Sequence, residues 1–126
     1  MILKNSLYTI VGKTMKEQAV TYDIQLDASH LIYQAHFPEE PVTPGVCIIQ
    51  IAKELLEDHL QQQLSIRMVK NVKFVAIISP LQNPRVTYEL QKIEADKEAG
   101  TFKVVADVHD SISGTAFSKI SMTCSR

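Results

Sequence analysis

One segment of the chain has apolar residues at helical spacing. Between Pro44 and about Leu60, steps of three and four dominate, and the apolar residues are Val46, Ile48, Ile49, Ile51, Ala52, Leu55, Leu56 and Leu60. The first half is apolar nearly all round and is expected to be buried, whereas the charged second half is expected to reach the surface. Its charged residues are Lys53, Glu54, Glu57 and Asp58. Thr43 is expected to cap this helix, with Pro44 at its first position.

Most of the remaining chain alternates between apolar and polar residues, the period of a half-buried strand. Such alternation occupies residues 20–27, 85–93, 102–108 and 117–124. A more continuously apolar strand is expected over 68–78, and turn signals lie at 97–100 and 109–114. Five or six antiparallel strands leave an apolar face, which the helix is available to cover. The sequence predicts an α+β fold, with an antiparallel sheet wrapped around one long central helix.

Length and charge narrow the class of protein. The chain has 126 residues, 45% of them apolar, which suits a single domain over residues 1–126. Its 13 basic and 14 acidic residues nearly balance, which argues against nucleic-acid binding by bulk charge. No apolar run is long enough to cross a membrane, and residues 1–13 resemble a strand more than a signal peptide. We therefore expect a cytoplasmic protein that binds neither nucleic acid nor membrane.

The cysteine and histidine spacing gives no sign of a metal site. Cys47 and Cys124 form no CxxC motif, so a zinc site or a disulfide framework is unsupported. His30, His59 and His109 have no partner at metal-ligand spacing. We expect two ordinary thiols and no metal.

A stiff loop leads into the predicted helix. Residues 36–46 read HFPEEPVTPGV, and the three prolines restrict the backbone and lower the entropy lost on ordering the loop. The free N–H groups at a helix N-terminus favour a developing negative charge, and Gly45 has no side chain to keep a ligand carbonyl away. His36 beside such a site can act as a base near neutral pH. On these residues alone, a purely structural loop remains an alternative.

The pattern His-Phe-Pro-x-x-Pro-x-x-Pro-Gly-Val at 36–46 resembles the signature of the β-hydroxyacyl-(acyl carrier protein) dehydratases of fatty acid synthesis. The order of elements and the segment KNVKFVAIISP at 70–80 are similar as well. The resemblance implies a hot-dog fold and no cofactor. It also implies that water is eliminated from a carrier-bound 3-hydroxyacyl thioester to give the trans-2-enoyl thioester, in fatty acid or polyketide/polyene synthesis. Acyl carrier protein would be a partner, and the chain would form a homodimer or a heterodimer with a related hot-dog subunit.

The resemblance also assigns roles to individual residues. His36 would remove the proton from C2 of the thioester, and the N–H of Gly45 would polarise its carbonyl. Phe37, Tyr33 and Val46 are expected to contact the substrate, although Tyr33 and Phe37 are equally compatible with simple packing.

The chain departs from the family pattern at position 50, where the family has Glu or Asp and this sequence has Gln50. An amide does not titrate, so Gln50 could hold the leaving hydroxyl or a water but could not protonate it. His36 would then return the proton. Three interpretations remain open: an active dehydratase, a weak or inactive subunit that receives a carboxylate from an active relative, and a hot-dog thioesterase.

Basic residues offer one further hypothesis. Lys70, Lys73 and Arg85 could join Arg67 in a patch for the acidic carrier protein, although ordinary solvated strand charges are the favoured interpretation.

Overall fold

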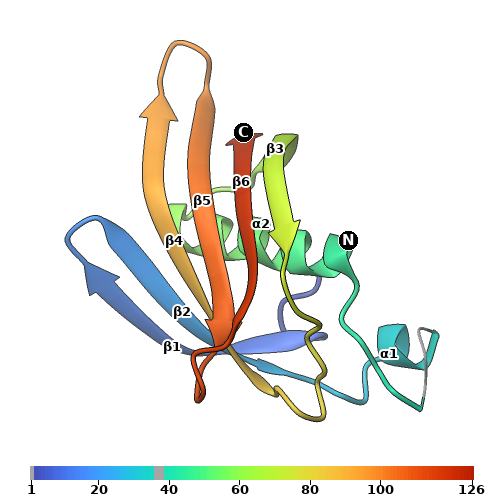
Figure 1. Ribbon diagram of the computed structural model, residues 1–126. Coiled ribbons are helices and arrows are strands. Elements are labelled where there is room, and N and C mark those ends of the chain that lie inside the picture. The colour runs from blue at the N-terminus through green and yellow to red at the C-terminus, as the bar shows by residue number, and fades with distance from the viewer. Residues whose placement is uncertain (1, 36–38) are drawn as a thin grey trace.

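The computed structural model describes residues 2–35 and 39–126. Within them, six strands and two helices follow one another as β1 (Tyr8–Lys16), β2 (Ala19–Leu26), α1 (Leu31–Ala35), α2 (Gly45–Leu60), β3 (Ser65–Phe74), β4 (Arg85–Asp96), β5 (Thr101–Asp110) and β6 (Ala116–Ser125). The strands form one antiparallel sheet in the order β1-β2-β4-β5-β6-β3 (Figure 1). The alternating segments of the sequence are therefore strands, as predicted.

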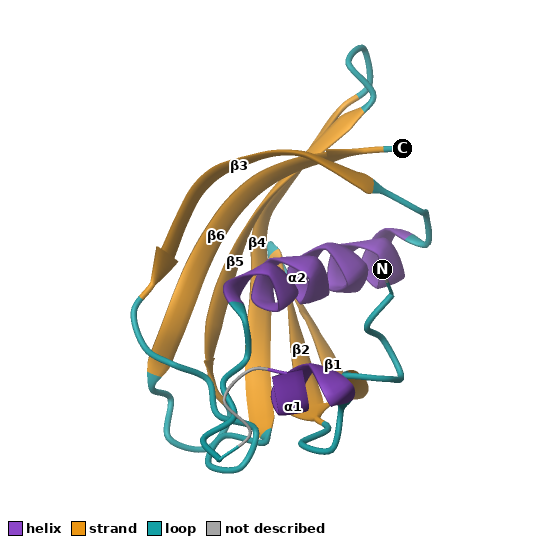
Figure 2. Cartoon of the chain, turned by 90° about the vertical axis from the view of Figure 1, so that its right-hand side faces the viewer, coloured by secondary structure: helices purple, strands orange, loops and turns teal. Residues whose placement is uncertain are grey.

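The sheet curves, and α2 lies on its concave side (Figure 2). Inward-facing residues of the strands meet the buried side of this helix, and the core they form includes Tyr22, Ile24, Tyr88, Leu90, Val104, Ala106, Ile120, Met122, Ile51 and Leu55. The predicted bounds of the helix hold within a residue. With 16 residues, however, α2 is not a long helix.

The start of α2 differs from the expected cap. Pro44 is the N-cap residue, with extended backbone angles, and no side chain caps the helix. Thr43 is buried, and its hydroxyl is hydrogen-bonded to the Tyr33 hydroxyl at 2.9 Å. The prediction that Thr43 caps the helix was wrong because the helix begins one residue later than expected, which puts Pro44 at the cap position, and the Thr43 hydroxyl bonds to Tyr33 instead.

The burial of α2 also departs from the sequence-based expectation at two positions. Val46, in the apolar first half, is 64% exposed, because the sheet covers the opposite side of the helix. Glu54, in the charged second half, is only 5% exposed. A count of apolar residues could not reveal these positions, because burial depends on what packs beside each face.

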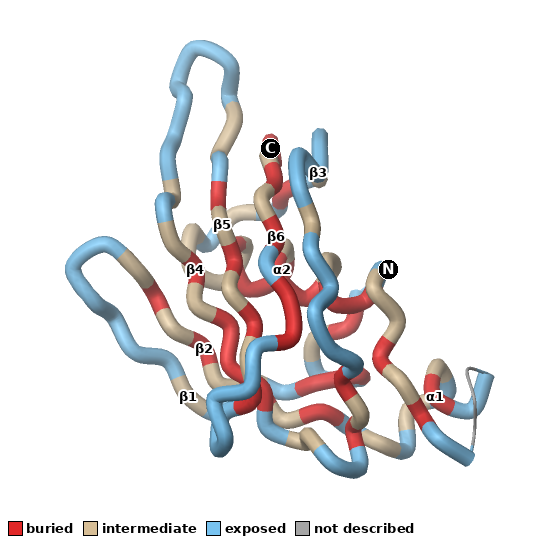
Figure 3. Tube along the Cα trace, in the orientation of Figure 1, coloured by how far each residue is buried: buried red, intermediate tan, exposed pale blue. Residues whose placement is uncertain are grey.

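The apolar strand expected over 68–78 is shifted. It begins at Ser65 and ends at Phe74, after which the N–H groups of Val75 and Ala76 donate to the carbonyl of Phe117. β3 lies at one edge of the sheet, and most of its residues are exposed (Figure 3).

Candidate active site

The first turn of α2 presents backbone N–H groups at the surface predicted to be catalytic. The N–H groups of Cys47 and Ile48 donate to the carbonyl of Pro44, at 3.0 and 3.1 Å. Those of Gly45 and Val46 precede these bonds, so they have no acceptor within the helix. Together with the helix dipole, they favour negative charge developing on a ligand oxygen.

An aromatic ring lies directly against Gly45. A Cβ atom at this position would come within 2.8 Å of Cζ of Phe74 and 3.0 Å of its Cε2. Only glycine permits this approach without displacing the ring. Phe74 ends β3 and is 50% exposed, so it forms part of the surface around the helix start. In the sequence, only the position of Phe74 within the apolar run 68–78 indicated that it would lie in the sheet.

Tyr33, expected to contact substrate, is 2% exposed and hydrogen-bonded to Thr43 across the loop. Burial is the main cause that raises the pKa of its phenol to about 12, so the ring stays neutral at physiological pH. This arrangement ties α1 to the residue before the N-cap of α2 and favours a packing role. His36 and Phe37 lie outside the described residues, so their assigned roles remain predictions.

Gln50 lies one turn beyond Val46 on the same side of α2 and is half-buried. Its amide Nε2 donates to Oε2 of Glu54, the next residue on this side, at 2.9 Å. Gln50, at the position where the resembled family has a carboxylate, is therefore hydrogen-bonded to the carboxylate of Glu54, one turn further along the helix.

Glu54 accepts four hydrogen bonds. Besides Gln50, its donors are the N–H of Leu3 at 2.8 Å, the N–H of Lys4 at 2.7 Å and the hydroxyl of Tyr8 at 2.9 Å. Burial, followed by the charge of Glu54, raises the pKa of the Tyr8 phenol well above its usual range. A carboxylate has about four acceptor positions, so the protein itself occupies all of those on Glu54. Glu54 thus fastens the N-terminal segment to α2 and offers no position to a substrate hydroxyl.

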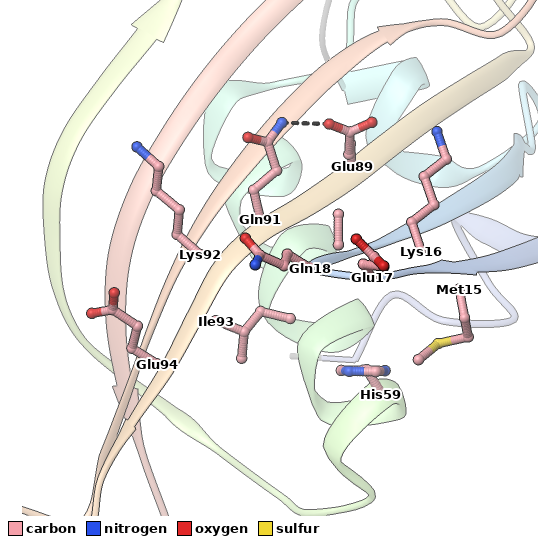
Figure 4. Close-up of a pocket in the computed structure, with 11 residues that line it drawn as sticks. Met15, Lys16, Glu17, Gln18, His59, Glu89, Gln91, Lys92, Ile93 and Glu94 are labelled. Carbon is pink, nitrogen blue, oxygen red and sulfur yellow. Dashed lines mark hydrogen bonds between the residues drawn. The ribbon is translucent and has the colours of Figure 1, made fainter.

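A separate hollow of about 770 Å³ lies near the opposite end of α2. Figure 4 shows His59 of α2 facing it together with Met15 and Ile93, from the β1–β2 hairpin and β4. The Nδ1 atom of His59 is buried without a hydrogen-bond partner in the described structure. Burial, followed by the charge of Lys13, lowers the pKa of His59, against an opposing effect of Asp58. Fourteen residues, or roughly 21 Å of helix, separate His59 from Gly45.

The remaining reactive groups are inert where the structure describes them. Cys47 and Cys124 are fully buried free thiols. Burial raises the pKa of Cys47, and it is the main cause that raises that of Cys124 to about 11. No three His, Cys, Asp or Glu residues within 2–35 and 39–126 gather as metal ligands. In the same part of the chain, no helix is long and apolar enough to cross a bilayer.

These features define a class of protein. A curved antiparallel sheet around one helix, whose N-terminus carries the Pro-Gly end of the dehydratase signature, is the arrangement of the hot-dog dehydratases. A family model for the ApeI-like proteins, described as ApeI dehydratase, matches residues 12–115. The chain belongs to the ApeI-like dehydratase family. A comparison with curated proteins gives no match.

Solved structures share the fold. The dehydratase heterocomplex ApeI:P from Xenorhabdus doucetiae aligns with a TM-score of 0.64 and 20% identity, covering 93% of this chain and 96% of that chain. A thioesterase from Haemophilus influenzae aligns with a TM-score of 0.64 and 15% identity, covering 95% and 78%. A putative thioesterase from Lactococcus lactis reaches 0.69 with 11% identity, covering 99% and 96%. At these identities, the neighbours establish the hot-dog fold alone.

Proposed function

We propose that this protein is a 3-hydroxyacyl-thioester dehydratase that acts on an acyl chain carried by acyl carrier protein. The observation that carries the proposal is the glycine at the start of α2, whose N–H has no acceptor in the helix, within a chain of a dehydratase family. A thioester carbonyl that accepts from the Gly45 N–H gains stabilisation as negative charge moves onto its oxygen.

The proposed reaction uses His36 as both base and acid. Its imidazole takes the proton from C2, and the resulting electron pair forms the C2–C3 double bond as the C3–O bond breaks. The imidazolium then gives the same proton to the departing hydroxide, which leaves as water. A histidine can take and return a proton in this way because its pKa lies near neutrality.

The contacts of Glu54 support the assignment of both proton transfers to His36. Glu54 is the buried carboxylate nearest along the helix to Gln50, but its acceptor positions are filled by protein donors. Gln50 cannot titrate and commits one amide donor to Glu54. In this proposal, Gln50 is a fixed polar group that helps to hold the 3-hydroxyl, and it does not supply a proton.

A second candidate is a weak or inactive subunit that works only with an active relative. Gln50 favours it, because the family carboxylate is missing from this chain. The fold neighbour ApeI:P is described as a heterocomplex, which makes pairing with a related subunit a reasonable expectation here too. The two thioesterase neighbours carry no comparable argument for hydrolysis, because their likeness extends to the fold alone.

The test is to incubate the purified protein alone with a 3-hydroxyacyl carrier protein and to follow the acyl chain by mass spectrometry. We expect the acyl mass to fall by one water, and we expect the His36→Ala variant to give no product. Glu39→Gln, at an exposed position of the same loop, is a control that keeps the histidine. Product formed only after a carboxylate-bearing relative is added would support the second candidate instead.

A further inference from the structure

The side-chain amide of Gln50 is held in one orientation by Glu54. Its Nε2 atom donates to Oε2 of Glu54 at 2.9 Å. The same carboxylate accepts from the backbone N–H groups of Leu3 and Lys4, one on each oxygen, and from the hydroxyl of Tyr8. A backbone N–H can only donate, so both oxygens of Glu54 act as acceptors. The amide of Gln50 must therefore turn its NH₂ group, and not its oxygen, towards Glu54.

This orientation decides which atom Gln50 offers to a ligand. The oxygen and the nitrogen of an amide lie on different sides of its carbonyl carbon, so Oε1 points away from Glu54. An amide oxygen has two acceptor positions, so it can accept from a ligand in addition to any other contact of this side chain. Gln50 is half-buried and lies one turn beyond Val46 on the same side of α2. Near the start of the helix, Gln50 therefore presents a hydrogen-bond acceptor.

An acceptor distinguishes the two oxidation states of an oxygen on C3 of an acyl chain. A C3 hydroxyl donates its hydrogen to Oε1 and keeps its lone pairs for the proton with which it leaves as water. A C3 ketone has no hydrogen to donate, so its oxygen would face another acceptor. The carboxylate of Glu54, one turn away, adds to this difference, because negative charge repels a ketone oxygen and attracts a hydroxyl hydrogen. Sites that hydrogen-bond a substrate hydroxyl reject analogues without it.

We propose that Gln50 selects a 3-hydroxyacyl chain over its 3-oxo form by accepting the hydroxyl hydrogen on Oε1, and that Glu54 is the positioning residue that sets this polarity. The inference rests on the proposed function, because it places the C3 substituent of the substrate at Gln50. It adds the oxidation state that the site accepts. A chain that carries a C3 ketone binds poorly until a reduction has converted the ketone to an alcohol.

The test compares two ligands that cannot eliminate water. The 3-hydroxybutanoyl and 3-oxobutanoyl amides of aminopantetheine carry nitrogen in place of the thioester sulfur. In the hydroxy amide this makes the C2 proton too weakly acidic for elimination, and the oxo amide has no leaving hydroxyl. NMR titration gives the Kd of each ligand for the parent and for each variant.

Two substitutions at position 50 and one control accompany the parent. Gln50→Met has a side chain of similar length without an amide acceptor. In Gln50→Glu, a proton shared with Glu54 leaves the other carboxyl oxygen as an acceptor towards the ligand. Gln63→Met is the matched control, because Gln63 is exposed and lies beyond the opposite end of α2.

We expect the parent to bind the 3-oxo amide about tenfold or more weakly than the 3-hydroxy amide, which corresponds to about one hydrogen bond. Gln50→Met should bring the two Kd values within about threefold of each other, mainly by weakening binding of the 3-hydroxy amide. Gln50→Glu and Gln63→Met should both keep the preference of the parent.

Glu54→Met tests the positioning role. Without the acceptor at position 54, the amide of Gln50 can turn either group towards the ligand, so the preference should fall to about threefold or less. A purely structural role of Glu54 would weaken binding of both amides alike and leave their ratio unchanged. Circular dichroism checks that this variant folds.

A measurement on the parent tests the same point without a variant at position 54. Leu3 N–H and Gln50 Nε2 both donate to Oε2 of Glu54, so their hydrogens lie close together. A nuclear Overhauser contact between them should persist when the 3-hydroxy amide is bound. Its loss on binding would overturn the positioning role of Glu54.

Equal affinity of the parent for the two amides, or a preference for the 3-oxo amide, would overturn the proposal, because an N–H of Gln50 serves a ketone as well as a hydroxyl. Absence of binding by the 3-hydroxy amide would overturn it too. Neither amide can eliminate water, so these outcomes are distinct from the result of the dehydration assay. Dehydration without the preference contradicts this inference alone, whereas the preference without dehydration contradicts only the proposed activity.

Discussion

Replacing Glu54 with glutamine tests the buried contact that the structure adds to the sequence analysis. The carboxylate is 5% exposed and accepts from two backbone N–H groups, one phenol and one amide. An amide of the same shape keeps one acceptor oxygen and directs an NH₂ group towards donors. About two of the four bonds are therefore lost, and buried donors face another donor.

The expected loss follows from the strength of such bonds. A hydrogen bond to a charged group contributes about 1.5–3 kcal/mol, so the loss of two should lower the free energy of unfolding of Glu54→Gln by about 3–6 kcal/mol. That is a large part of the about 5–15 kcal/mol typical of a domain. Tyr8→Phe removes one donor and leaves the others in place, so it should cost about 1.5–3 kcal/mol.

Urea unfolding followed by circular dichroism measures these differences. Glu57→Gln is the matched control on the same helix, because Glu57 is half-buried and an amide can still accept from the N–H of Leu64. Its cost should stay below about 1 kcal/mol. A loss of under about 1 kcal/mol for Glu54→Gln, or the same loss for Glu54→Gln and Glu57→Gln, would refute the idea that Glu54 fastens the N-terminal segment.

Three further variants probe the helix and its two ends. Gly45→Ala should change the free energy of unfolding by less than about 1 kcal/mol, because the gain in helix propensity offsets the displacement of the exposed Phe74 ring. The same variant should lower kcat/KM for dehydration by about 10²-fold, because the substrate carbonyl is misplaced relative to the N–H of residue 45. Activity equal to that of the parent would contradict the role of Gly45. Burial lowers the pKa of His59, so the parent should lose stability as pH falls below about 6.5, the pKa of histidine in the unfolded chain. In thermal melts at each pH, His59→Asn should lose less stability on acidification than the parent. The same dependence of Tm on pH in both proteins would contradict this prediction. Gln50→Glu should raise turnover of a 3-hydroxybutyryl carrier protein by less than about tenfold, and an increase of about 10²-fold would show that a missing acid limits the parent.

Local patterns in the sequence were sufficient to predict the sheet and the helix. Alternation identified β2, β4, β5 and β6, and the three-and-four spacing placed α2 within a residue of its observed bounds. These signals are local, because the apolar residues of a half-buried strand recur at every second position and those of a helix at every third or fourth. The prediction for Thr43 was wrong because the helix begins one residue later than expected and the Thr43 hydroxyl bonds to Tyr33, ten residues earlier in the chain.

The surroundings of the candidate site could not be predicted in the same way. Glu54 appears as one of several charges in a polar half-helix, and its burial depends on Leu3, Lys4 and Tyr8, about fifty residues earlier. Phe74 meets Gly45 only because β3 pairs with β6 rather than with a sequence neighbour. Both contacts are set by topology, which period and composition do not specify.

The neighbour of Gln50 gives a physical reason for an amide at that position. Oε2 of Glu54 accepts from Nε2 of Gln50 at 2.9 Å, so the residue at position 50 must donate a hydrogen bond there. A carboxylate could not donate, and two carboxylates in such contact repel each other until they share a proton. A carboxyl introduced at position 50 would hold that proton towards Glu54, which is the reason to expect little catalytic gain from Gln50→Glu. Its raised pKa should also make the variant lose stability relative to the parent as pH rises from about 5 to about 8. A stability difference independent of pH would mean that the two side chains do not share a proton, and the family carboxylate would then be compatible with Glu54.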